Sequence, residues 1–309
     1  MDLKKVAEAA KTVRMPVMAL LIYLVIQLLV SLCVPGKTTP SGEVSAQWLG
    51  TTLFISSVLT TAAIVGWRRF DLRRAFTGVG CCWKGALAAI CGTLLGLLAA
   101  SIFNDFLPLK NVMEESFSGM SNCTIGLLAI ALVGPICEEV VFRGGVMQPL
   151  LNRGVRPWVV IAVSAAIFGL VHLNPAQIRF AAICGVIFAV VFYRTGSLVI
   201  PIVCHVANNS FSAWQMIRAE QTGEPEATWT GLLGGTVPAI AVMLLAAAAS
   251  ALLLRYLWRH TEPHARDERD ALNDLLRNLE IPGVTDRPLD EMPAPEAKNE
   301  HVEPVKTSL

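Results

Sequence analysis

Residues 127–151 read LLAIALVGPICEEVVFRGGVMQPLL, an apolar stretch with two glutamates and an arginine in its middle. A run of about 18 or more apolar residues is long enough to cross the hydrocarbon core of a bilayer as an α-helix. An ionisable side chain at that depth costs at least about 2.5–3.5 kcal/mol, so it usually faces a bundle interior and has a partner or a function. The stretch therefore predicts a membrane-spanning helix with Glu138, Glu139 and Arg143 turned inward.

The spacing within this stretch separates the two glutamates. Glu139 and Arg143 are four residues apart, so on a helix they share a face and can pair. Glu138 is rotated by about 100° from Glu139 and is left available as a general acid or base. The alternative is that the span ends before Glu138 and the charges lie in a solvated turn. Apolar residues continue to Leu151, which favours the continuous helix.

The composition extends the membrane prediction to the whole chain. The 309 residues are 54% hydrophobic and 16% charged, whereas soluble domains average about 45–50% and about 25%. A net charge of +1 gives no support for nucleic-acid binding, which needs a clustered basic face. We therefore expect an all-α membrane protein with a bundle of about eight transmembrane helices. The uncharged windows that predict them lie at 15–36, 44–67, 85–104, 116–137, 157–178, 180–193, 195–217 and 227–254.

The loops predict the orientation of the bundle. Lys and Arg gather at the N-terminus, in the loop 68–74, at 153–156, at Arg194 and at 255–259, whereas the alternate loops are acidic or mixed. Basic loops stay on the cytoplasmic side, so both termini are expected there, in the plasma (inner) membrane. The first apolar run, 15–34, is longer than the h-region of a signal peptide and is expected to be retained.

Two domains are expected. Residues 1–259 form the bundle, with the motif-bearing core at 127–214, and residues 260–309 form a cytoplasmic tail that is largely disordered. In this tail, four leucines at helical spacing predict one short amphipathic helix. Gly92 and Gly96 form a GxxxG pattern that indicates close packing between membrane helices. The four leucines are Leu272, Leu275, Leu276 and Leu279.

Two further apolar segments carry polar residues. Phe168 and His172 lie in FGLVH, and His205 and Asn209 lie four residues apart in HVANN. Taken singly, a lone histidine is more often a packing residue, and a polar helix face often joins two helices. Together with the glutamates and the arginine, they make up the inventory of a hydrolase.

The three segments resemble, in order and spacing, the motifs of the CAAX protease and bacteriocin-processing (CPBP, or Abi) family. EExxxR is present as Glu138, Glu139 and Arg143, FxxxH as Phe168 and His172, and HxxxN as His205 and Asn209, across residues 127–214. The resemblance implies a bundle of about eight helices around a cavity reached from the cytosol or the membrane. It also implies endoproteolysis, which in eukaryotic relatives removes three residues after a prenylated cysteine.

The resemblance implies roles for the motif residues. Glu138 with His172 would activate a water, His205 and Asn209 would stabilise the oxyanion, and Arg143 would hold Glu139. Phe168 would contact the substrate. We expect no cofactor; a zinc ion held by Glu138, His172 and His205 is the alternative, since these supply a three-ligand set with an open position.

Two other functions stay open at this point. Buried Glu, His and Arg also build the proton relays of transporters, although the chain shows no internal repeat. A non-catalytic immunity or scaffold protein is the other. For a peptidase, the expected partners are the lipid bilayer and a peptide or protein substrate, with prenylated proteins among the open classes, and no nucleic acid. The sequence does not indicate an oligomeric state.

Overall fold

The computed structural model describes residues 3–39, 44–68, 83–113, 119–120, 123–224 and 226–261. The chain divides into two units, Met1–Arg266 and Asp267–Leu309. The tail and its predicted amphipathic helix, beyond residue 261, lie outside the described residues.

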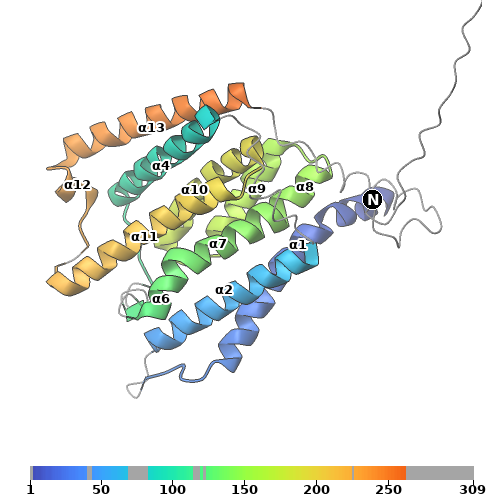
Figure 1. Ribbon diagram of the computed structural model, residues 1–309, viewed down its shortest axis with the longest axis horizontal. Coiled ribbons are helices and arrows are strands. Elements are labelled where there is room, and N and C mark those ends of the chain that lie inside the picture. Colours follow the sequence, from blue (N-terminus) through green and yellow to red (C-terminus); the bar gives the residue numbers. More distant parts are fainter. Residues whose placement is uncertain are drawn as a thin grey trace, which may run out of the picture. The chain divides into compact units, whose positions relative to one another are not determined.

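The described part is helical, apart from an isolated bridge between Thr38 and Val44, which confirms the all-α prediction. Figure 1 shows the long helices side by side. Six helical segments are long and apolar enough to cross a membrane. With the shorter α9 and the less apolar α11, they make eight helical segments, roughly consistent with the predicted bundle. The elements are α1 (Leu3–Cys33), α2 (Ala46–Arg68), α4 (Trp83–Phe106), α6 (Thr124–Leu128), η1 (Ala129–Val133), α7 (Gly134–Glu139), η2 (Val140–Met147), α8 (Gln148–Asn152), α9 (Pro157–Leu170), α10 (Pro175–Thr195), α11 (Val199–Thr222), α12 (Trp229–Leu232) and α13 (Thr236–His260).

The fourth predicted span runs past the charged motif. The consecutive elements α6, η1, α7, η2 and α8 form one helical segment, Thr124–Asn152. The alternative of a solvated turn at Glu138 is therefore wrong. The segment is the most deeply packed of the six, with half of its most apolar window buried.

The predicted fifth span, 157–178, is broken in the structure. Helix α9 ends at Leu170, Leu173 takes a positive φ of 52°, and α10 starts at Pro175. Proline lacks the N–H that a helix interior needs and keeps the preceding residue, Asn174, out of the helical region. In consequence α10 has 21 residues and is longer than the window of 180–193 from which it was predicted.

The seventh span also differs from its prediction. Helix α11 has 24 residues but is not among the six segments that are apolar enough to cross a membrane. Its buried residues lie near its start, and beyond His205 only Ala213 is buried. The later turns carry polar side chains because this half of the helix borders a cavity, described below.

The GxxxG pattern in α4 packs closely against α13, beside it in Figure 1. A Cβ at Gly96 would lie 2.8 Å from the Ser250 Oγ and 2.9 Å from the Ile187 Cδ1. The Ser250 hydroxyl donates a hydrogen bond of 2.7 Å to the carbonyl of Gly92. The close packing predicted from the two glycines is confirmed.

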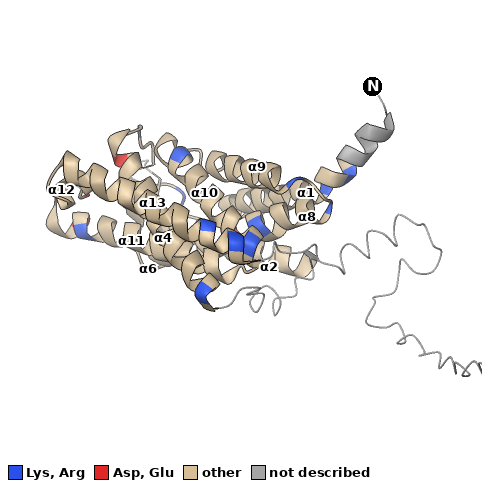
Figure 2. Ribbon diagram, turned by 90° about the horizontal axis from the view of Figure 1, so that it is seen from above, with Lys and Arg blue, Asp and Glu red and all other residues tan. Residues whose placement is uncertain are grey.

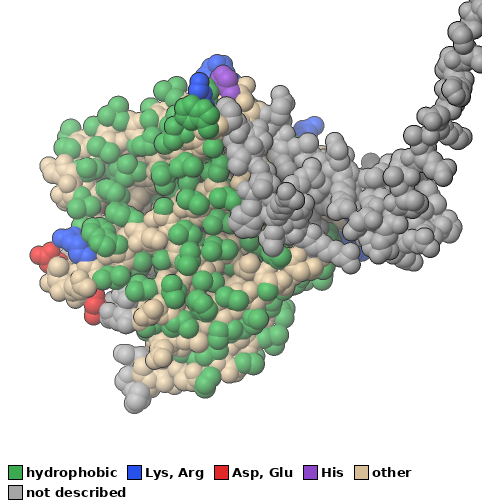
Figure 3. Space-filling model, in the orientation of Figure 1, with side chains coloured by type: hydrophobic (Ala, Val, Ile, Leu, Met, Phe, Trp, Pro, Cys, Tyr) green, Lys and Arg blue, Asp and Glu red, His purple; other side chains and the backbone are tan. Residues whose placement is uncertain are grey.

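The outer surface of the bundle is apolar. Figure 3 shows hydrophobic side chains spread over one face, with the charged groups at its margins. Many large apolar side chains are exposed, including Leu245 at 71% and Leu252 at 68%. Such a surface is expected where lipid rather than water surrounds the helices. With the six long apolar helices, it identifies an integral membrane protein.

Charges differ between the two ends of the bundle. One end, where α4 and α9 start and α10 and α13 stop, is called the basic end; among the described side chains it carries eight Lys and Arg and no Asp or Glu. The opposite end is called the mixed end, and Figure 2 shows acidic residues near α12 there. The basic end carries Lys11, Arg14, Lys84, Arg153, Arg156, Arg194, Arg255 and Arg259. The described charges of the mixed end are Lys37, Lys110, Arg179, Arg218, Asp105, Glu220, Glu224 and Glu226.

Candidate active site

The helical segment with the two glutamates is irregular on both sides of them. The π-helical turns η1 and η2 flank the short α-helix α7, which ends at Glu139. π-turns inside α-helices occur frequently at functional sites because they change which side chains face inward. The carbonyl of Ile130, in η1, accepts a hydrogen bond of 3.1 Å from the Nδ2 of Asn209 on α11. Asn209 of the third motif is thus bonded to the helical segment that carries the first motif.

Glu139 is completely buried and uses both carboxylate oxygens. Its Oε2 lies 3.0 Å from the Nε of Arg143, and its Oε1 lies 2.9 Å from the Nδ1 of His205. The pairing with Arg143 predicted from their spacing is confirmed. The contact with His205 was not predicted, since no sequence pattern relates residues 66 positions apart. A buried carboxylate requires such partners because its desolvation is unfavourable.

Arg143 is also completely buried and connects three helices. Its Nη2 donates a hydrogen bond of 3.1 Å to the carbonyl of Gly185 on α10. Its guanidinium carbon lies 5.1 Å from the ring centroid of Phe168 and 5.5 Å from that of Phe188. Within the described part of the chain, Nη1 has no hydrogen-bond partner. The faces of the two phenylalanine rings and the Glu139 carboxylate therefore offset much of the unfavourable desolvation of the guanidinium charge.

His205 lies between the two glutamates. Its Nδ1 contacts Glu139, and its Nε2 lies 3.7 Å from the Oε2 of Glu138. Its ring stacks on Phe188, with centroids 5.0 Å apart and an interplanar angle of 28°. Because Glu139 accepts the Nδ1–H, the orientation of the imidazole is fixed and Nε2 is directed toward Glu138.

His172 follows the last turn of α9, and its Nδ1 lies 2.8 Å from the Phe168 carbonyl. The Phe168 ring contacts both histidines, with centroid distances of 5.1 Å to His172 and 5.9 Å to His205. Asn208 donates a hydrogen bond of 3.2 Å to the Oδ1 of Asn209. Phe168, the two histidines and both asparagines line one cavity.

Glu138 has a different environment from Glu139. Its side chain is 22% exposed, and it interacts electrostatically with Tyr23 of α1. Glu138 is not among the residues that line the cavity, and the structure places it in no direct hydrogen bond or ion pair with His172. The predicted site residues thus converge on one region, with Glu138 next to His205.

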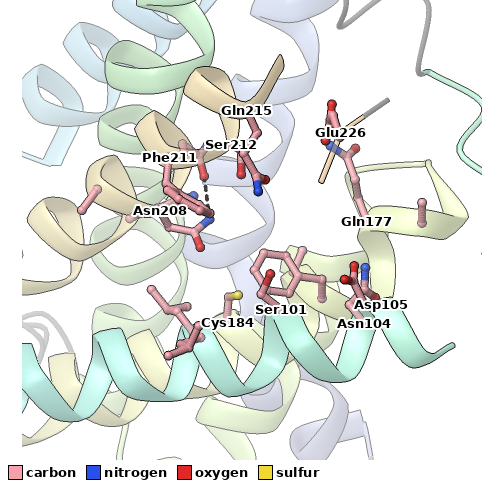
Figure 4. Close-up of a pocket in the computed structure, with 18 of the residues that line it drawn as sticks. Ser101, Asn104, Asp105, Gln177, Cys184, Asn208, Phe211, Ser212, Gln215 and Glu226 are labelled. Carbon is pink, nitrogen blue, oxygen red and sulfur yellow. Dashed lines mark hydrogen bonds between the residues drawn. The ribbon is translucent and has the colours of Figure 1, made fainter. Parts of the chain in front are cut away.

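The cavity beside these residues has a volume of about 540 Å³. Figure 4 shows side chains from α4, α10 and α11 directed into it, including Ser101, Cys184 and Ser212. Its walls near Phe168 are apolar and formed by Leu94, Leu97, Phe180 and Phe188, while amides and carboxylates line the remainder. A cavity with an apolar wall and a few convergent polar groups is the usual form of a binding site.

The residues proposed as zinc ligands do not form a metal-binding group. Within the described residues, no three His, Cys, Asp or Glu side chains lie close enough together to hold an ion. We derive no step through a metal.

The bundle and its buried cluster define the class of protein: an integral membrane protein with a carboxylate–histidine–arginine site beside an intramembrane cavity. Residues 120–211 match the family model described as "Type II CAAX prenyl endopeptidase Rce1-like". This segment is therefore similar to the CAAX-type membrane protease family that the three motifs indicated.

Two curated relatives each match part of the chain. "Membrane-embedded CAAX protease MroQ" of Staphylococcus aureus is 33% identical over 92 residues, which cover 28% of this chain and 37% of that protein. "Putative membrane peptidase YdiL" of Bacillus subtilis is 29% identical over 85 residues, which cover 28% of this chain and 34% of that protein. The chain thus spans about a third of the length of these relatives. No solved structure matches.

Proposed function

We propose that this chain is an intramembrane endopeptidase that hydrolyses a bond in a peptide or protein substrate. The observation that carries the proposal is the position of His205, held by Glu139 and facing Glu138 at one end of a cavity that His172 and Asn209 also line. An oriented imidazole beside a second carboxylate is the arrangement that acid–base hydrolysis requires.

In the proposed reaction, Glu138 acts with His172 to take a proton from a water molecule, which attacks the scissile carbonyl. His205 and Asn209 then donate hydrogen bonds to the developing oxyanion. When this intermediate collapses, the scissile C–N bond breaks and the proton taken from the water passes to the leaving amine nitrogen. His205 can donate through Nε2 while its Nδ1–H stays on Glu139 only when both ring nitrogens carry a proton. The second Nδ2 hydrogen of Asn209 is free for the same purpose, since the Ile130 carbonyl uses one. Oxyanion donors commonly contribute about 2.7–4 kcal/mol each.

Arg143 and Glu139 act as positioning residues in this scheme. Arg143 holds the Glu139 carboxylate in place, and Glu139 fixes the ring of His205. The substrate is a peptide of the CAAX type or a related one, and the protein resides in the plasma (inner) membrane with both termini in the cytoplasm. No metal or other cofactor is required.

The proposal predicts that Glu138→Ala and His172→Ala each abolish cleavage while the protein still inserts into the membrane. The substrate is found by comparing membrane proteomes of cells with the wild-type protein and cells with Glu138→Ala, and cleavage is then measured with purified variants. Glu224→Gln is the matched control, because its carboxylate is 70% exposed at the mixed end of the bundle. Substantial cleavage by either alanine variant contradicts the proposal.

A further inference from the structure

The cavity extends from the histidines to one end of the bundle. Along α11 its lining runs from His205 to Met216, a rise of roughly 16 Å along the helix. Along α4 it runs from Leu94 to Asp105, a similar length. Figure 4 shows Asn104, Asp105, Gln177 and Glu226 together at the far side of the cavity from Asn208. These four residues belong to the mixed end.

The opposite direction is closed by packed side chains. Between the histidines and the basic end, one core cluster joins η2, α8, α9 and α10, and includes Met147, Val160 and Leu198. A second cluster joins α4, α10, α11 and α13, and includes Cys204 and Leu257. The first seven residues of α11 contain four buried side chains, Ile200, Pro201, Cys204 and His205. No described residue of the basic end lines the cavity.

The charges assign the two ends to the two sides of the membrane. The described part of the basic end carries eight cationic side chains and no acidic one, whereas the mixed end carries four of each. Loops rich in Lys and Arg remain on the cytoplasmic side. The basic end is therefore cytoplasmic, and the cavity opens at the other end. Its described lining includes two carboxylates, Asp105 and Glu226, and no Lys or Arg.

We infer that the site is entered from the non-cytoplasmic side of the membrane, so that its substrates are peptide segments exposed on that side. The inference rests on the proposed peptidase function and narrows its substrate class. It departs from the expectation of a cavity reached from the cytosol. An extended chain covers roughly 3.3–3.6 Å per residue, so about four to five residues connect the opening to the histidines. Side-chain amides along this path supply hydrogen bonds to a peptide backbone.

The side of access is tested with a membrane-impermeant, charged maleimide on spheroplasts with a sealed membrane. Gln215→Cys introduces a thiol into the cavity near its opening, and Lys84→Cys introduces an exposed thiol at the basic end of α4. Mass spectrometry of the labelled peptides identifies the modified position despite the native cysteines. We expect labelling of residue 215 in sealed spheroplasts, and of residue 84 only after permeabilisation. Ala227→Cys, also at the opening, replaces Gln215→Cys if that variant does not accumulate.

The reversed pattern, with residue 84 labelled in sealed spheroplasts and residue 215 only after permeabilisation, overturns the inference. A second measurement separates it from the proposed function. A pool of internally quenched, charged peptides is given to right-side-out vesicles, to inverted vesicles and to detergent-solubilised protein. Cleavage in detergent and in right-side-out vesicles supports both proposals. Cleavage in detergent and in inverted vesicles, with none in right-side-out vesicles, overturns the proposed side of access. If labelling gives the expected pattern and detergent samples with the natural substrate show no cleavage, only the peptidase proposal fails.

Discussion

At the scale of single residues, Glu139 rather than Glu138 is the centre of the buried network. It contacts Arg143 on its own helical segment and His205 on α11, and all three side chains are buried. Removing one partner of a buried charge pair is far more damaging than its contribution to net stability suggests, because the other charge stays buried. The network therefore adds little net stability to the fold, and we infer that its main effect is to fix the orientation of the His205 ring.

This arrangement predicts the behaviour of Glu139→Gln. The amide can present its N–H₂ group to the Nδ1 of His205 and so reverse the direction of that hydrogen bond. The ring is then neutral, and a neutral ring is a weaker donor to the oxyanion than a doubly protonated one. We expect kcat to fall on the order of 10²–10⁴-fold, while KM changes little. Steady-state kinetics on the folded fraction, measured with the substrate found by proteomics, tests this expectation.

Glu139→Asp is the matched variant, since it keeps the carboxylate and is expected to recover part of kcat. A Glu139→Gln protein with the kcat of the wild type would show that the ring orientation does not depend on this contact. A decrease confined to thermal stability would indicate a structural role only.

The sequence predicted the site at this scale in part. The helical spacing of Glu139 and Arg143 gave their pairing, because that contact lies within one element. The contacts of His205 with Glu139, of Asn209 with the Ile130 carbonyl and of Arg143 with Phe188 join separate helices. Spacing along the chain does not specify which turns of two helices meet, so these contacts emerged only from the packing.

At the scale of elements, the apolar windows predicted which segments form helices better than they predicted the residues at which the helices begin and end. The absence of charge between residues 157 and 178 suggested one span, yet the backbone constraint of Pro175 divides it into α9 and α10. The π-turns of η1 and η2 also had no sequence signal, since their pattern of apolar residues is that of an ordinary helix. Charge and hydropathy determine which segments are helical, whereas local backbone chemistry determines where they stop.

The glycine contact between α4 and α13 gives a prediction at this scale. In Gly96→Ala, the new methyl group would lie 2.8 Å from the Ser250 Oγ and 2.9 Å from the Ile187 Cδ1. Either these two side-chain ends rotate away, which breaks the hydrogen bond from Ser250 to the Gly92 carbonyl, or the helices separate. We expect the bundle to be destabilised by about 1–3 kcal/mol. Thermal unfolding of the detergent-solubilised protein measures the effect.

Gly66→Ala is the control for helix propensity, because no atom lies within 4 Å of a Cβ at that position of α2. It is expected to leave stability unchanged or slightly raised, as alanine favours helix more than glycine does. Equal decreases in the two variants would argue against a specific contact at Gly96.

At the scale of the whole molecule, Arg194 of α10 holds the C-terminal end of α13. Arg194 donates hydrogen bonds of 2.6 Å to the carbonyl of Trp258 and of 3.2 Å to the hydroxyl of Thr261. Its guanidinium carbon also lies 4.7 Å from the Trp258 ring centroid. These contacts fix the C-terminal end of α13 against the end of α10.

Two truncations test how far the bundle extends. A chain that ends after Arg266, the limit of the first unit, is expected to keep the unfolding temperature and the peptidase activity of the full chain. A chain that ends after Leu257 loses both acceptors of Arg194 and is expected to unfold several degrees lower, since about 1 kcal/mol corresponds to roughly 2–4 °C. Thermal scans in detergent compare the three proteins, and an unstable chain of 266 residues would contradict the expectation.

The short helix α9 has a consequence for the surrounding lipid. Its 14 residues measure about 21 Å, well below the roughly 30 Å of a hydrocarbon core, and the chain turns back at Leu173, which is 81% exposed. Acyl chains beside this flank must compress or tilt to cover it, and polar headgroups descend toward the turn. We therefore expect the bilayer to be locally thinner beside His172, which shortens the route from the membrane surface on the side of this turn to the histidines.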